Sequence, residues 1–147
     1  MKKFKILTFL SLIPFLVQAQ KNCIDDFELD TQGNILSGIC AGMSITSGSQ
    51  NVVLGNDAGV QLTTGSRNIL FGFRSGTSMN AFDNVFIGER TGENNTQSGN
   101  VFIGSFAGES NTTGLANVYI GLQSGRASTT SGFNTFVGQF SGSNITH

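Results

Sequence analysis

The sequence predicts an all-β protein, a single-chain parallel β-solenoid (β-roll) of about seven short coils. A pattern that begins with Asn recurs seven times, at steps of 16 or 17 residues, along the 147-residue chain. The chain contains 20 Gly and one Pro, which indicates many tight turns in a regular structure rather than a disordered chain. Each repeat holds one apolar stretch of three residues, so a repeat fits one strand with its turns and is too short for a helix pair or a propeller blade.

Residues 1–19 read as a secretory signal peptide. Lys2, Lys3 and Lys5 form a basic start, residues 6–17 form an apolar stretch too short to span a bilayer, and Ala19 closes a small-residue cleavage site. A buried N-terminal helix is the alternative. The signal peptide predicts an exported protein, located outside the cell or on the cell surface.

The charge of the mature chain excludes one class of partner. Removing the signal takes three of the eight basic residues and none of the nine acidic ones, so the net charge becomes 5 − 9 = −4. An acidic chain without a basic patch argues against nucleic acid as a partner. No second long apolar run exists, so we expect no membrane insertion of the mature chain.

Residues 20–33 differ from the repeats and are predicted to cap the N-terminal end of the solenoid. Residues 27–30 alternate as a strand does, and residues 31–34 have the composition of a turn. A cap is expected there because an open solenoid end invites aggregation. Cys23 and Cys40 are the only cysteines, and export permits a disulfide between them that would fasten the cap to the first coil.

Residues 34–147 form the seven repeats, and four positions define them. With Asn as position 0, positions +4 and +8 are Gly in every repeat and position +7 is always small. Stacked Asn side chains can bond from coil to coil, and Gly suits corners with positive φ or crowded backbones. The repeats start at Asn34, Asn51, Asn68, Asn84, Asn100, Asn117 and Asn134.

Positions +1 to +3 are predicted to form the strand of each coil, and all three are nearly always apolar. Alternation sends +1 and +3 to one face and +2 to the other. Since one face fills the coil and a coil this narrow cannot cover the other face, the pattern predicts self-association.

The run Asn-Val-Phe-Ile-Gly, followed by a small residue and a second Gly, resembles the head repeats of trimeric autotransporter (YadA-like) adhesins and related bacterial and phage fibre repeats. The resemblance implies a left-handed roll, a homotrimer and a role in surface attachment. It also implies that residues at +1 and +3, such as Val85 and Ile87, point into the coil. Position +2 would then face neighbouring chains, and its members are Leu36, Val53, Leu70, Phe86, Phe102, Tyr119 and Phe136.

The residues that carry most enzyme chemistry are scarce, so we expect no catalytic residue, no cofactor and no metal site. The single His is His147, the last residue, which leaves little for a His-based triad or a zinc site. The acidic residues are scattered, and Glu89 and Glu93 are expected on the solvated surface. The chain also lacks the regular Asp column of calcium-binding solenoids.

Position +12 suggests a second functional hypothesis, because six of its seven residues are Thr. Stacked Thr side chains about 4.8 Å apart are similar to the ice-binding surfaces of antifreeze proteins, although Thr also suits a strand edge or turn. The six are Thr46, Thr63, Thr96, Thr112, Thr129 and Thr146. The sequence therefore predicts a non-enzymatic structural or adhesive solenoid, part of a surface fibre or adhesin head, with an ice-binding protein as the alternative.

Overall fold

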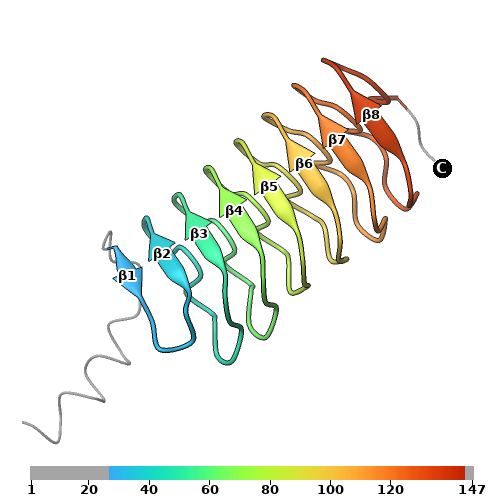
Figure 1. Ribbon diagram of the computed structural model, residues 1–147. Coiled ribbons are helices and arrows are strands. Elements are labelled where there is room, and N and C mark those ends of the chain that lie inside the picture. Colours follow the sequence, from blue (N-terminus) through green and yellow to red (C-terminus); the bar gives the residue numbers. More distant parts are fainter. Residues whose placement is uncertain (1–26, 145–147) are drawn as a thin grey trace, which may run out of the picture.

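The computed structural model describes residues 27–144 and confirms the all-β parallel solenoid (Figure 1). Eight strands form one sheet in chain order, and the described residues contain no helix. The strands are β1 (Glu28–Leu29), β2 (Ile35–Ser37), β3 (Val52–Leu54), β4 (Ile69–Phe71), β5 (Val85–Ile87), β6 (Val101–Ile103), β7 (Val118–Ile120) and β8 (Thr135–Val137).

Strands β2 to β8 are parallel and pair in the register of the repeat. Ile35 lies opposite Val52, and the same position faces itself at every later step, including the two 16-residue steps. Backbone bonds join the coils at both ends of the strand. For example, the Ile35 N–H donates to the Asn51 carbonyl at 2.8 Å and the Gly88 N–H donates to the Phe71 carbonyl at 2.7 Å.

The strand β1 covers the outer edge of β2 by pairing with it antiparallel. Asp30, in the turn that follows, accepts hydrogen bonds from Asn34 through both carboxylate oxygens, with the backbone N–H and the side-chain amide each at 2.8 Å. The carboxylate thus takes the place of a preceding repeat Asn.

The Asn column forms a buried ladder of amides. The Oδ1 of Asn34 accepts from the backbone N–H of Asn51 at 2.8 Å and from its Nδ2 at 2.9 Å, and the same Nδ2 donates to the Gly65 carbonyl at 3.0 Å. Only a short side chain with both a donor and an acceptor can serve the coil before it and its own coil at once. This explains why Asn occupies every position 0.

A side chain added at either of the two Gly columns would clash, but with a different neighbour in each column. At Gly104, where φ is +124°, an added Cβ would lie 2.5 Å from the carbonyl oxygen of Gly121 in the next coil. At Gly108, where φ is +58°, it would lie 2.5 Å from the ring of Phe102. Position +4 is therefore Gly because backbones stack closely there, and position +8 because the core side chain needs the space.

Position +2 points into the coil, so the predicted direction of the strand faces is wrong. Residues at +1 and +3 are exposed or half-buried in all seven repeats, while those at +2 are buried in the first six and half-buried in the last. The residues expected at an oligomer interface instead form the core. They are Leu36, Val53, Leu70, Phe86, Phe102, Tyr119 and Phe136.

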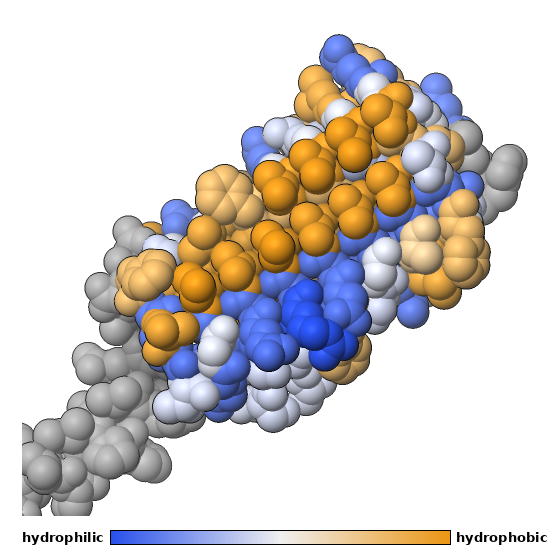
Figure 2. Space-filling view, in the orientation of Figure 1, coloured by the Kyte–Doolittle hydropathy of each residue, from blue (hydrophilic) through white to orange (hydrophobic). Residues whose placement is uncertain are grey.

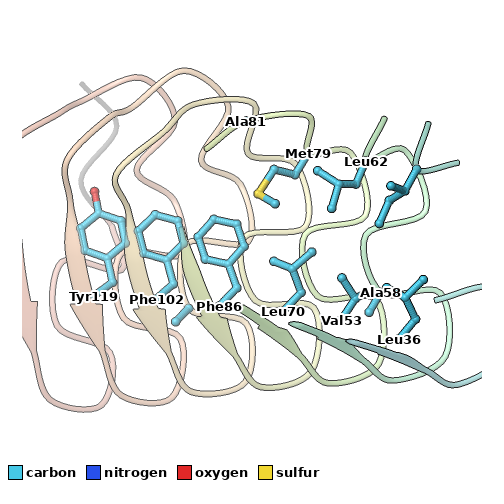
Figure 3. Packing of buried hydrophobic residues seen from close by; sticks show 12 residues of the cluster. Leu36, Val53, Ala58, Leu62, Leu70, Met79, Ala81, Phe86, Phe102 and Tyr119 are labelled. Atoms are coloured by element: carbon cyan, nitrogen blue, oxygen red, sulfur yellow. The ribbon is translucent and has the colours of Figure 1, made fainter. Parts of the chain in front are cut away.

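The core changes in character along the rod (Figure 3). In the early coils Val53 and Leu70 share the interior with Leu62 and Met79 at position +11. From β5 onward position +2 is aromatic, and the rings stack with centroids 4.7 to 5.0 Å apart, close to the spacing of the strands that carry them. Opposite these rings, position +11 changes to smaller or polar residues, all buried: Asn95, Asn111 and Ser128.

Candidate functional site

The main candidate is the outer strand face, defined as positions +1 and +3 of β2 to β8. These side chains point away from the coil because alternation places them opposite the buried +2 column. Figure 2 shows them as two continuous apolar rows along the rod. The face consists of Ile35, Ser37, Val52, Leu54, Ile69, Phe71, Val85, Ile87, Val101, Ile103, Val118, Ile120, Thr135 and Val137.

The outer strand face carries no charge. Its two polar members, Ser37 and Thr135, lie on the first and last strands of the face. Five of its twelve apolar side chains are exposed, from 36% for Ile87 to 52% for Phe71 and 65% for Val137, and the other seven are half-buried. Single exposed apolar residues are common on soluble proteins, but a contiguous apolar strip of this length usually marks a contact surface.

Charged residues border one row of this face. Arg67 and Asp83 directly precede the Asn residues that lead into β4 and β5, and they form a two-bond ion pair at 2.6 and 2.9 Å. The Arg67 guanidinium lowers the pKa of Asp83, chiefly by hydrogen bonding to it. A shallow hollow lies at the N-terminal end of the other row, lined by Phe27, Leu54, Phe71 and neighbouring residues.

A ladder of ion pairs lies on a second part of the surface. Glu93 accepts from Arg74 at 2.7 Å and from Arg90 at 2.6 Å, while Glu109 accepts from Arg90 at 2.9 Å and from Arg126 at 2.7 Å. Both carboxylates are buried, so the expectation that Glu93 is a solvated surface residue is wrong. Because each carboxylate is held by two guanidinium groups, neither is left free for acid–base chemistry.

An aromatic ring lies within the same ladder. The guanidinium carbons of Arg90 and Arg126 lie 5.6 and 5.5 Å from the ring centroid of Phe106, within cation–π range. The two arginines that hold Glu109 are thereby also held in place, and with Arg74 the ladder joins four successive coils. The charged groups of the ladder pair with one another, so we interpret the ladder as a structural feature that holds the coils together.

The Thr column lies at a turn and bonds from coil to coil. The hydroxyls of Thr46, Thr96 and Thr112 each donate to the backbone carbonyl of the Thr in the next coil, at 3.2, 2.8 and 3.0 Å. Thr63 and Thr129 are half-buried, and Thr146 lies outside the described residues. In the third coil Asn80 replaces Thr, and its Oδ1 accepts from backbone N–H groups including that of Thr63 at 3.0 Å. Three of the hydroxyl donors are therefore already used within the fold.

Several predicted features fall partly outside the described residues. Cys40 lies in the corner after β2, whereas Cys23 is outside, so the disulfide stays a prediction. His147 is likewise outside. Within residues 27–144, no group of three or more His, Cys, Asp or Glu is placed to hold a metal ion. The same residues contain no helix with the length and apolarity needed to cross a membrane.

Compared with known protein families, with curated proteins and with solved structures, the chain finds no match in any of the three. The resemblance to adhesin head repeats therefore remains an expectation from the repeat motif.

One signal in the sequence could have identified the inward column. Position +2 changes from aliphatic Leu70 to aromatic Phe86, and in the same coil position +11 changes from Met79 to Asn95. Columns that change volume in opposite directions are expected when they fill the same interior, because interiors are close-packed. Tyr119 and Ser128 show the pairing directly, since their hydroxyl oxygens lie 2.9 Å apart inside the coil.

Proposed function

We propose that the protein is an exported, non-enzymatic structural module that forms part of a surface fibre or adhesin head. The observation that carries this proposal is the outer strand face, an uncharged apolar strip that runs along a rod of stacked coils. A strip of this kind needs to be covered or to adhere, and a rod presents it over its whole length. The module works as a homo-oligomer, for which the adhesin resemblance implies three chains.

The way the remaining polar groups are used supports a structural role. The Asn ladder joins every pair of neighbouring coils from β2 to β8. The buried carboxylates Glu93 and Glu109 are saturated by arginines. Residues that carry chemistry in enzymes thus hold the coils together, while the apolar face remains available for contact.

Ice binding through the Thr column is the second candidate, supported by the exposure of Thr46, Thr96 and Thr112 on stacked coils. It has less support than the structural role, because the hydroxyls of these three residues donate to neighbouring carbonyls. An ice-recrystallisation assay tests it, with Thr112→Ala as the variant. Inhibition of crystal growth that Thr112→Ala weakens would favour ice binding over the structural role.

Localisation tests the structural proposal. The full chain, with a C-terminal epitope tag, is expressed in a Gram-negative host beside a variant that lacks residues 1–19. We expect the full chain to start after Ala19, to be labelled by antibody on intact cells and to be lost from them on protease treatment. The deletion variant should stay inside. Full-length protein that keeps its leader inside the cell, or that is released without attaching to any surface, would contradict the proposal.

A further inference from the structure

We infer that the outer strand face is the contact between two copies of this chain, packed face to face as a two-fold dimer. The inference rests on the proposed structural function and specifies how copies meet. Its basis is the two apolar rows in Figure 2, of which twelve of fourteen residues are Ile, Val, Leu or Phe and none is charged. The other strand residues, at +2, fill the coil and are not available for contact.

The chemistry of the face defines the partner. Its backbone groups are already paired between coils, as the bond from the Val101 N–H to the Asn117 carbonyl at 2.8 Å shows. Apart from the hydroxyls of Ser37 and Thr135 at its two ends, the face therefore offers no hydrogen bonds to a sugar, a nucleic acid or an added peptide strand, and it favours contact with apolar surface. The best partner presents apolar side chains repeated at the strand spacing of about 4.8 Å.

A second copy meets that requirement because it carries the same rows at the same spacing. Because position +2 points into the coil, the two rows of one copy are separated by the backbone of that residue, and a row of the partner can pack between them. Two sheets that pack in this way lie about 10 Å apart. A flat face that packs against the same face of a second copy across a two-fold axis is buried completely, so no further chain can add to it and the assembly is a dimer.

This stoichiometry differs from the trimer that the adhesin resemblance implies. Three chains around an axis would each have to present two complementary patches or to converge on the axis along a narrow edge. The apolar face instead has two parallel rows on a single sheet. The observations therefore favour two copies over three.

The area of the face sets the expected strength. An apolar side chain removes roughly 60–120 Å² from water when it is fully buried. The exposed fractions printed for Ile69, Phe71, Ile87, Ile120 and Val137 lie between 36% and 65%. Taking just under one-half for these five side chains and about one-fifth for the seven half-buried ones, the pair would bury about 450–900 Å², below the lower limit for stable complexes. We therefore expect a reversible dimer with a Kd of about 10–100 μM, strengthened when copies are held together on a surface or fibre.

Sedimentation equilibrium of the mature chain from about 5 to 500 μM, a range that spans the expected Kd of about 10–100 μM, tests the inference. The variant Val85→Lys with Val101→Lys adds two charges to the centre of the face. The matched control, Thr113→Lys with Thr130→Lys, adds the same charges to exposed turns elsewhere. A third variant, Val85→Thr with Val101→Thr, keeps side-chain shape and strand preference, in case the lysines impair folding.

We expect wild type and control to pass from monomer to dimer with the same Kd. The lysine pair should raise the dimer Kd at least tenfold, and the threonine pair should raise it several-fold. A wild-type chain that stays monomeric at 500 μM, a mass of three chains, or folded variants that dimerise like wild type would overturn the inference. A dimer found without surface attachment of the tagged chain would contradict the proposed function alone. A surface-attached chain that forms a trimer in solution would contradict the dimer alone.

Discussion

Replacing Phe102 by Ala tests the orientation of the strand faces most directly. The side chain is fully buried, and its ring lies between those of Phe86 and Tyr119, with centroid distances of 5.0 and 4.7 Å. Removing it leaves a cavity in the middle of the stack and takes a neighbour from each of the two rings. If position +2 faced outward, the same change would remove only a surface contact.

The expected loss is large for a protein of this size. A buried Phe→Ala change lowers the free energy of unfolding by about 3–5 kcal/mol. Domains are stable by about 5–15 kcal/mol in total, so the variant should lose a large share of its stability. The control is Ile103→Ala, one residue along on the half-buried outer face, for which we expect a loss of about 1–2 kcal/mol because less surface is uncovered.

Urea unfolding measured by intrinsic fluorescence suits this comparison. Tyr119 is the only tyrosine and the chain has no tryptophan, so the signal comes from the stack next to residue 102. With a urea dependence of about 2 kcal/mol per molar, the Phe102→Ala midpoint should fall by about 2 M. Far-UV circular dichroism reports whether the distant coils unfold together with the stack. A midpoint for Phe102→Ala no lower than that of Ile103→Ala would refute the inward orientation.

Three further predictions concern corners, ionisation and the cap. Gly104→Ala should lower the free energy of unfolding by about 3 kcal/mol or more in thermal unfolding, and the control Gly99→Ala by about 1 kcal/mol. A Cβ at Gly104 would lie 2.5 Å from the next coil, whereas one at Gly99 (φ +75°) would meet nothing closer than 4.0 Å. Equal losses would contradict the stacking explanation. Burial raises the pKa of Tyr119, so its contribution to stability is complete below the unfolded pKa of about 10 and is lost as the pH rises through the higher folded value; a 295 nm titration of the native protein showing a pKa of about 10 would argue against this. Finally, Cys23 and Cys40 should form an intrachain disulfide worth about 3 kcal/mol, and free thiols in unreduced native protein by mass spectrometry would disprove it.

The sequence by itself determined the period, the strands and the corners. Position 0 must be Asn because one amide serves two coils, as Asn51 does with Asn34 and Gly65. Position +4 must be Gly because Gly104 lies against the backbone of Gly121. These requirements are local and repeat in each coil, so they appear in the sequence as invariant columns.

The face that turns inward was decided only by the tertiary structure. Positions +1, +2 and +3 are nearly all apolar, so alternation separates two faces without indicating which one is buried. The choice depends on contacts with residues elsewhere in the coil, such as Gly108, whose missing side chain makes room for the ring of Phe102. The sequence pattern did not predict the burial of Glu93 for the same reason, since its partner Arg74 lies in the preceding coil. A repeat pattern shows which residues share a column, but which columns face each other depends on how the coil closes.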